Sequence, residues 1–401
     1  MSEPVDSVPM LTSDAIATEV SFSPFAFAST TTVFLLIGAT SSLYGPLLIS
    51  FSHRFHVSLP EAGIVLSIHF VGALFGVPLG WLTVKRIPGR VALSCALFLM
   101  AAGACGVALL HSWYPFLACV FVIGVGFGDL DFILNTLMAR TAFKGRAHRM
   151  SVGNAGYGVG AVVGPLLIIL LAPKNFPMLF GGIAVTAVLL STVNRGVHAP
   201  PLRAEVNQRE LTMMKSQRRP ILITFIVAFI FYVAAETSTS GWLASQLHRT
   251  GYSASLGSFI TAAFWSALAL GRVFGGPLHK RFGDHFLVIV GLVLTIALCF
   301  GAYFHVLAPY AYSLMGLTIA SVYPMGLIWY TVLCPHDSDG LALMILFMMI
   351  GGIIGPGAES LLVSLVGIHV VPVVIGVYAL LALGVFASAL RFHPVATRTV
   401  S

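Results

Sequence analysis

Charged residues are scarce in this chain of 401 residues. Asp, Glu, Lys and Arg together make up 9% of the sequence, whereas an ordinary soluble domain contains about 25%. So little charge cannot cover the surface of a water-soluble particle of this size. The scarcity excludes a soluble enzyme, and the 58% hydrophobic content, with 40 Gly and 29 Phe, indicates a chain that lies mostly in lipid.

Several chemical motifs are also missing. The first 24 residues contain no Lys or Arg, so they lack the basic region of a signal peptide. The sequence has no phosphate loop, no nucleophile elbow and no His-Glu-x-x-His motif, which argues against ATP-driven transport and enzymatic chemistry and leaves no cofactor to expect. The cysteines lie in apolar stretches without Cys-x-x-Cys spacing, so neither a disulfide framework nor a metal site is expected; they are Cys95, Cys105, Cys119, Cys299 and Cys334.

Apolar runs between polar breaks predict twelve membrane-spanning helices. A helix needs about 20 apolar residues to cross a bilayer, and a chain of this length accommodates about twelve such segments. The fold class expected is therefore an all-α membrane protein. The predicted helices cover residues 25–50, 61–84, 91–111, 113–139, 150–172, 175–193, 220–246, 254–279, 284–305, 307–334, 340–366 and 369–392.

The basic residues between these helices lie almost entirely on one side of the membrane. If both termini are cytoplasmic, all but four of the 21 Lys and Arg fall on the cytoplasmic side. Arg54, Lys174 and Arg249 fall outside, and Arg272 lies within a helix. This pattern predicts a multi-pass protein of the inner (plasma) membrane with both termini cytoplasmic. The formal charge of +7 then needs no nucleic-acid partner to explain it.

The longest polar stretch divides the chain near its middle and suggests two duplicated halves. Residues 160–165 (GAVVGP) match residues 351–356 (GGIIGP), which is the trace that a duplicated transporter fold leaves in sequence. The expected organisation is a disordered acidic cytoplasmic tail (1–24), an N-terminal six-helix bundle (25–193), a basic cytoplasmic linker (194–219), a C-terminal six-helix bundle (220–392) and a cytoplasmic tail (393–401).

Twelve spans in two halves, with basic turns after the second and eighth, resemble the major facilitator superfamily. In that family the first such turn usually has the motif Gly-x-Leu-x-Asp-Arg-x-Gly-Arg, and residues 80–90 here read GWLTVKRIPGR. Val84 stands at the acidic position, so the charge relay between domains that is usually assigned to that acid is not expected. The resemblance implies the major facilitator fold and a transporter.

Four carboxylates lie inside predicted spans, where an ionisable group costs about 2.5–3.5 kcal/mol and needs a partner or an aqueous cavity. They are Asp129, Asp131, Glu236 and Glu359. Function is the first interpretation of such residues, and the alternative is pairing with an Arg or capping of a broken helix. Asp131 and Asn135 share a helical face, and Asp129 points about 200° away. We therefore expect Asp131 to accept a proton and Asn135 to bind hydroxyl groups.

This acid and amide, four residues apart, resemble the acidic-x-x-x-Asn motif in the fourth helix of the fucose:proton symporter family, whose acid is implicated in proton coupling. Residues 154–160, which include Asn154 and Tyr157, and the pair that begins at Tyr323 also resemble patterns of that family. The resemblance implies substrate contacts by this segment. The first helix departs from the fucose permease, because it carries hydroxyl residues and Tyr44 instead of a second acid.

The seventh predicted helix carries Glu236, followed by Thr-Ser-Thr-Ser at residues 237–240. The segment is similar to the glutamate-containing seventh helix of glucose-transporting relatives. Ser240 lies one turn from the acid and Thr239 is adjacent, so the helix offers a carboxylate beside hydroxyl ligands. These small residues are also expected to loosen the helix, as in discontinuous transporter helices. The alternative is that they only pack.

Three tryptophans lie within predicted spans, where an indole ring could stack on a sugar: Trp242, Trp265 and Trp329. His69 is either a polar cavity residue or proton partner, or a buried histidine with a hydrogen bond. For Arg272 we expect snorkelling or contact with helix carbonyls.

Together these features predict a secondary active transporter for a small polar solute, a sugar or polyol, coupled to protons or Na⁺ and working as a monomer by alternating access. Asp131 and Glu236 are the expected coupling residues. A proton-antiporting drug or metabolite exporter is one alternative, because Met- and Phe-rich helices could line a permissive cavity. A receptor or lipid scramblase on the same fold is the other.

Overall fold

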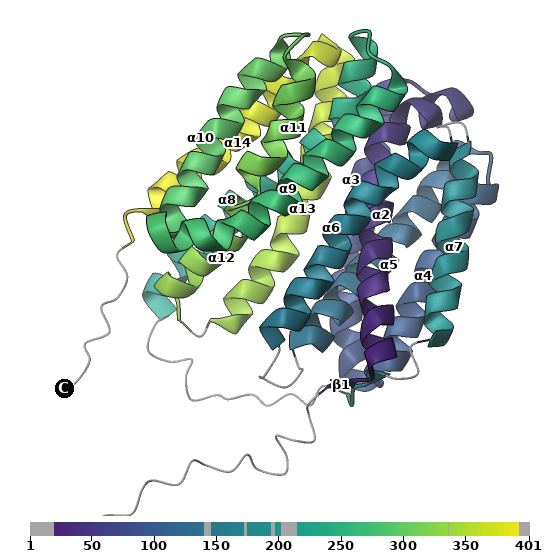
Figure 1. The fold of residues 1–401 in the computed structure, drawn as a ribbon, viewed down its shortest axis with the longest axis vertical. Coiled ribbons are helices and arrows are strands. Elements are labelled where there is room, and N and C mark those ends of the chain that lie inside the picture. Colours follow the sequence, from purple (N-terminus) through teal and green to yellow (C-terminus); the bar gives the residue numbers. More distant parts are fainter. Residues whose placement is uncertain are drawn as a thin grey trace, which may run out of the picture.

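Helices make up nearly all of the described chain. The computed structural model describes residues 20–139, 146–171, 175–193, 197–201, 215–335 and 337–392. Eleven described spans are long and apolar enough to cross a membrane, and Ala155–Leu171 is a shorter apolar helix, so the protein is a multi-pass membrane protein. Figure 1 shows the helices α2 (Pro24–Phe55), α3 (Leu59–Arg86), α4 (Gly89–Leu109), α5 (Trp113–Ala139), α6 (Arg146–Leu171), α7 (Phe176–Val193), α8 (Lys215–Arg249), α9 (Ala254–Phe282), α10 (Asp284–Tyr303), α11 (Ala308–Ile319), α12 (Val322–Leu333), α13 (Ser338–Val366) and α14 (Val371–Ala389).

The predicted helices have the order of the observed ones, with ends that differ by at most five residues. One predicted helix, 307–334, is divided, because α11 ends at Ile319 and α12 begins at Val322. Pro324 has no N–H to donate to the carbonyl of Ala320, and its ring crowds that carbonyl. The break therefore lies one turn before the proline.

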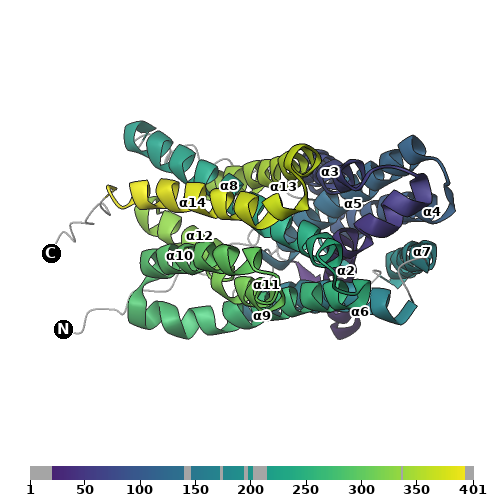
Figure 2. The same cartoon turned by 90° about the horizontal axis from the view of Figure 1, so that it is seen from above.

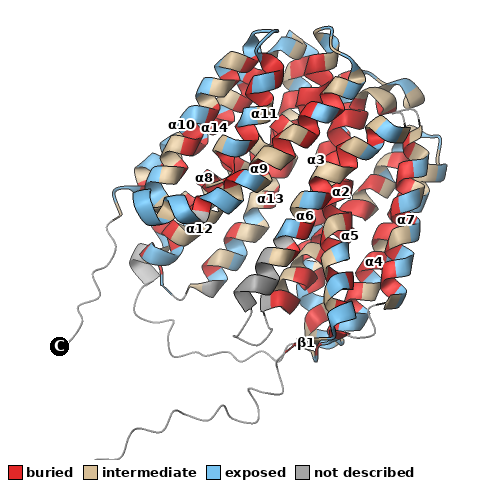
Figure 3. Ribbon diagram, in the orientation of Figure 1, coloured by how far each residue is buried: buried red, intermediate tan, exposed pale blue. Residues whose placement is uncertain are grey.

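The outer surface of the helices is apolar. Figure 3 shows buried residues where helices meet and many exposed residues on their outward sides. The exposed set includes large side chains such as Phe75, Leu170 and Phe300, which are 61%, 78% and 70% exposed. Water would disfavour so much exposed apolar area, whereas lipid accommodates it, so these side chains indicate the membrane-facing surface.

The helices form two bundles. Seen from above, α8 to α14 gather on one side and α2 to α7 on the other (Figure 2). Within the first bundle, a Cβ at Gly160 of α6 would overlap the carbonyl oxygen of Leu35 in α2; within the second, a Cβ at Gly351 of α13 would overlap that of Ile230 in α8. The matching Gly-containing motifs thus pack against the first helix of their own bundle, as small residues do in membranes.

Close contacts join the bundles on the side away from the chain termini. We call the end where α2 begins and α14 ends the termini face, and the opposite end the far face. Gly45 of α2 lies so close to α8 that a Cβ there would overlap the carbonyl oxygen of Ser240. The Ser67 hydroxyl of α3 donates a 2.7 Å hydrogen bond to the carbonyl of Ile353 in α13. We call this contact between the bundles the far seam.

A short strand pair corrects part of the predicted termini and linker. β1 (Ser21–Phe22) pairs antiparallel with β2 (Val197–His198), whereas residues 1–24 were expected to be disordered and residues 194–219 to be a linker. The Gly89 N–H also donates a 2.9 Å hydrogen bond to the carbonyl of Ala199. The start of the linker is therefore fastened to the first bundle.

Asp337 ties three helices of the second bundle together at the termini face. Its carboxylate accepts hydrogen bonds from the Arg218 guanidinium at 2.6 and 2.7 Å, from the Tyr330 hydroxyl, and from the Gly340 N–H at 2.8 Å as the cap of α13. Partial burial opposes ionisation, but these hydrogen bonds outweigh it and hold the pKa of Asp337 below its usual range.

Replacing Asp337 by Asn is expected to lower the thermal unfolding midpoint. The free energy of unfolding should fall by about 1–3 kcal/mol, because the cap is weakened and the charge-assisted bonds are lost. A lowered pKa stabilises the fold above the unfolded value of about 3.9, and this contribution disappears as the pH falls through the lower, folded-state pKa. The difference between Asp337→Asn and wild type should therefore shrink in acid. The exposed Asp339→Asn is the matched control, and an equal loss in both variants would contradict this role.

Candidate functional site

Asp131 and Asn135 of α5 form a connected polar pair. The Asn135 amide donates hydrogen bonds to the carboxylate of Asp131 at 3.1 Å and to its backbone carbonyl at 2.9 Å. Neither side chain is fully buried. The two residues therefore share one face of α5, as their spacing predicts, and present a carboxylate and a carboxamide together.

Tyr157 of α6 lies within electrostatic reach of Asp131. Its hydroxyl is 3.0 Å from the Ser41 hydroxyl of α2, and its ring is 6.5 Å from that of Trp265 in α9. An aromatic wall and two hydroxyls are thus brought together from three helices. The sequence interpretation named Tyr157 and Trp265 but not Ser41, whose signal is its place among the hydroxyl residues of the first helix.

Glu236 of α8 has a basic partner. Its carboxylate lies 3.9 Å from the Arg272 guanidinium of α9, which also lies 6.0 Å from the ring centre of Tyr323 in α12. Snorkelling or carbonyl contact was expected for Arg272. The structure places it inside the protein as the counterion of Glu236 instead, because the helix faces of α8 and α9 bring both groups together.

The two groups of residues belong to one site. The hydroxyl of Tyr157 interacts electrostatically with Asp131, Glu236 and Arg272, and so does that of Tyr323. Two carboxylates from different bundles and one guanidinium therefore act on the same two tyrosine hydroxyls. We call Asp131, Asn135, Tyr157, Glu236, Arg272 and Tyr323 the central cluster.

Solvent reaches this cluster in part. The side chains of Arg272 and Glu236 are 34% and 13% exposed. The contacts of the far seam lie between the cluster and the far face, and from this we infer that solvent reaches the cluster from the termini face. Among the described residues, no group of three or more His, Cys, Asp or Glu could hold a metal ion.

The hydroxyl residues after Glu236 bond to their own helix. Thr237 donates to the Val233 carbonyl and Thr239 to that of Ala235, both at 2.7 Å, and Ser240 bonds to that of Thr237 at 3.3 Å. Ser and Thr in helices commonly make such bonds. α8 is continuous from Lys215 to Arg249. The expectation that residues 237–240 loosen this helix was therefore wrong. The division occurs between α11 and α12.

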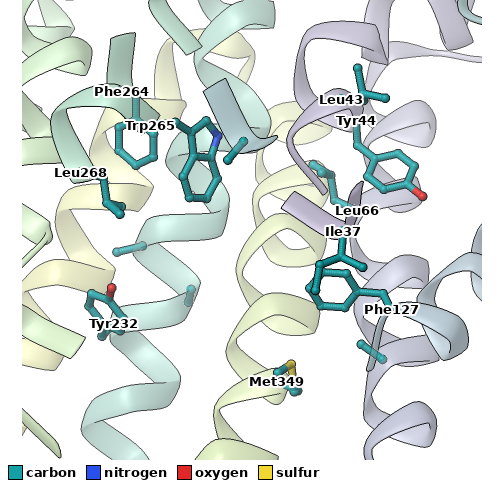
Figure 4. Close-up of a cluster of buried hydrophobic side chains, with 14 of the residues drawn as sticks. Ile37, Leu43, Tyr44, Leu66, Phe127, Tyr232, Phe264, Trp265, Leu268 and Met349 are labelled. Carbon is teal, nitrogen blue, oxygen red and sulfur yellow. The ribbon is translucent and has the colours of Figure 1, made fainter. Parts of the chain in front are cut away.

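Other predicted residues lie in packed positions away from the cluster. Tyr44 is buried in the first bundle, with ring centres 5.0 Å from His69 and 6.0 Å from Phe180, and Figure 4 shows it beside Leu43 on the opposite side of the view from Trp265. Both ring nitrogens of His69 are buried without a hydrogen-bond partner in the described chain. Neither residue therefore has the exposure that a substrate contact requires.

Two of the three named tryptophans are packing residues. Trp242 is fully buried at the far seam and contacts Gly63. Trp329 is 5% exposed, and its ring centre lies 5.3 Å from that of Phe225 and 6.1 Å from that of Phe386. Only Trp265 faces a member of the central cluster.

The remaining two acids are buried within separate bundles. Asp129 is 3% exposed and faces Gly80 of α3, on the side of α5 away from Asn135. Glu359 is fully buried in the second bundle, and neither of its carboxylate oxygens has a hydrogen-bond partner among the described residues. The Asn154 side chain lies outside the described part of the structure.

Comparisons with known proteins agree with this architecture. The profile of the Major Facilitator Superfamily matches residues 30–340. The uncharacterized MFS-type transporter YcaD of Escherichia coli is 24% identical over 322 residues, which cover 77% of this chain and 81% of the relative. Bypass of stop codon protein 6 of Saccharomyces cerevisiae is 23% identical over 287 residues, and the match covers 63% of this chain and 56% of that protein.

Solved structures share the fold. A bacterial homologue of the human lysosomal transporter Spinster, inward-facing and unoccupied, superposes with a TM-score of 0.80 at 14% identity, covering 93% of this chain and 98% of that one. The Escherichia coli fucose:proton symporter gives 0.62 at 19% identity, covering 90% and 98%. These matches confirm the resemblance and the fold class expected from the sequence, and the chain belongs to the major facilitator superfamily of membrane transporters.

Proposed function

We propose that this protein carries a small polar solute, a sugar or polyol, together with protons by alternating access. The observation that supports this most directly is the central cluster, in which Asp131 and Glu236 come from different bundles and act on the same two tyrosine hydroxyls. Binding at such an interface couples solute and ion to the rocking of one bundle against the other.

The two acids have different surroundings, which suggests different roles. Arg272 is the counterion of Glu236, whereas Asp131 has only the Asn135 amide as a hydrogen-bond partner among the described residues. A carboxylate without a cation is costly to remove from water in the membrane. Closure of the site therefore favours the protonated form of Asp131, and we assign it the coupling proton.

The rest of the cluster and its neighbours Ser41 and Trp265 suit a hydroxylated solute. The Asn135 amide and the hydroxyls of Ser41 and Tyr157 can each donate and accept hydrogen bonds. The partly exposed ring of Tyr157 supplies an apolar face on which a sugar ring can lie, and the ring of Trp265, which is 7% exposed, supports it from behind. The excess of basic residues near the termini face supports a cytoplasmic location of that face, so this conformation is the inward-facing one.

The proposal is tested by thermal stabilisation followed by transport. Purified protein is heated with a panel of sugars, polyols, nucleosides, organic acids and cationic dyes, and the stabilising solute is then offered to proteoliposomes with an imposed pH gradient. We expect a sugar or polyol to raise the unfolding midpoint and to accumulate only when the gradient is present. Stabilisation by dyes alone, with proton-driven efflux, would replace the proposal with a drug exporter.

A further inference from the structure

The far face carries a cavity that the central cluster does not use. It has a volume of about 540 Å³ and lies between α2, α7, α8 and α9, with His53, Arg54 and His248 in its lining. A smaller hollow of about 220 Å³ shares both histidines and adds Arg249. We call the two together the basic vestibule.

The positive charge of the vestibule has no acidic partner in the described chain. Neither hollow has an Asp or Glu in its lining, and no ion pair to Arg54 or Arg249 is present among the described residues. Glu61 follows the lining residue Leu59 in sequence, but its carboxylate accepts hydrogen bonds from the N–H and hydroxyl of Ser58. The vestibule therefore attracts anions.

The Arg54 side chain is held in place, but its Nε donor lacks a hydrogen-bond acceptor among the described residues. Its guanidinium lies 5.4 Å from the ring centre of Phe176, a cation–π contact that holds it against the cavity wall. Its Nε is buried and has no hydrogen-bond partner among the described residues. A buried donor without an acceptor is unfavourable, and an oxyanion bound beside it would supply that acceptor through a charge-assisted bond.

Helix ends account for only part of this arrangement. Arg54 and Arg249 lie in the last turns of α2 and α8, where a cation complements the partial negative charge of the helix terminus. That effect explains one basic residue at each helix end. It explains neither a shared cavity nor the unbonded Nε, and these two residues are also two of the three basic residues that the sequence places on this side.

We propose that the basic vestibule binds a small oxyanion, through a carboxylate or phosphate group, and that the anion holds the two bundles together at the far face. Arg54 and His53 belong to the first bundle, and His248 and Arg249 to the second. The Nδ1–H of His248 donates to the Tyr252 carbonyl at 3.2 Å. Nε2 of the neutral ring therefore accepts a hydrogen bond from a protonated oxyanion such as dihydrogen phosphate, and it donates one only when the ring is protonated. One anion thus contacts both sides of the seam that alternating access must open.

The test measures thermal unfolding of the full chain in phosphatidylcholine nanodiscs while inorganic phosphate is titrated at an ionic strength held constant with chloride. We expect a saturable rise of the unfolding midpoint. Arg54→Gln should weaken the apparent phosphate affinity by about tenfold or more, since it removes a charge-assisted bond. Arg219→Gln, an exposed arginine at the other end of α8, should leave it unchanged.

Two further arms complete the test. The double variant His53→Gln, Arg249→Gln replaces exposed side chains, so it remains informative if Arg54→Gln does not fold, and it should weaken the response similarly. Nanodiscs with phosphatidylglycerol identify the source of the anion. If this lipid stabilises the protein without added phosphate, if that stabilisation requires Arg54, and if phosphate added afterwards has no further effect, the site binds a lipid headgroup. Equal responses in wild type and all variants, or none in either lipid, would overturn the proposal. The uptake assay is independent of these outcomes, so failure of this site and failure of the proposed function are separable.

Discussion

Replacing Asp131 by Asn is expected to abolish gradient-driven accumulation while leaving exchange of solute across the membrane nearly intact. The amide keeps the size and hydrogen-bonding capacity of the carboxyl group but cannot take up a proton. Each pH unit supplies about 1.4 kcal/mol per proton, so a gradient of two units can concentrate a solute by about a hundredfold. The Asn variant should reach no concentration ratio above about one, because it lacks the coupling proton.

The chain supplies a matched control two residues away. Asp129 is an aspartate on the same helix, but it is buried against α3 and away from the central cluster. Asp129→Asn should therefore retain the wild-type accumulation ratio once its expression is matched. Full accumulation by Asp131→Asn, measured with the solute that stabilises the protein, would remove Asp131 from the coupling role.

Replacing Gly45 by Ala is expected to shift the protein toward the conformation that is open at the far face. The added Cβ would overlap the carbonyl oxygen of Ser240 across the far seam, and neither backbone can move without separating α2 from α8. Overpacking of this kind costs about 1–3 kcal/mol, which corresponds to a population change of roughly 5- to 150-fold. Spin labels at Ser112→Cys and Val306→Cys, exposed positions near the far face on different bundles, report the change as a longer distance in a chain whose native cysteines have been replaced.

Two other glycines separate a shift between conformations from a loss of folding. A Cβ at Gly160 would overlap the Leu35 carbonyl within one bundle, so Gly160→Ala should lower the unfolding midpoint in both conformations without lengthening the distance between the labels. Gly182 has nothing within 4 Å of its added Cβ, and Gly182→Ala should change neither readout. An unchanged distance distribution in a folded Gly45→Ala protein would show that this contact does not control the seam.

Hydropathy was sufficient to predict the helices, because each must satisfy its backbone within the membrane and cover about 30 Å with apolar side chains. The break between α11 and α12 depends on one proline. Its effect could not be distinguished in advance from that of Pro46, Pro78 or Pro356, which lie within helices that continue past them.

The site was only partly predictable for a similar reason. Helical spacing correctly separated the faces of Asp131 and Asp129, since both lie on one helix. The ion pair between Glu236 and Arg272 joins two helices, and spacing within a helix says nothing about which face its neighbour meets. Composition likewise does not tell whether an indole such as that of Trp329 faces a cavity or packs against aromatic rings, as it does here against Phe225 and Phe386.

The strand pair at the termini face limits how the bundles are tethered. Because Phe22 pairs with Val197 and Asp337 holds Arg218, each end of the linker belongs to a different rigid body. Covalent geometry alone limits the distance between Pro201 and Lys215 to about 50 Å. The covalent connection therefore sets only an upper limit on the separation of the bundles, and the contacts that hold them together in this conformation are those of the far seam.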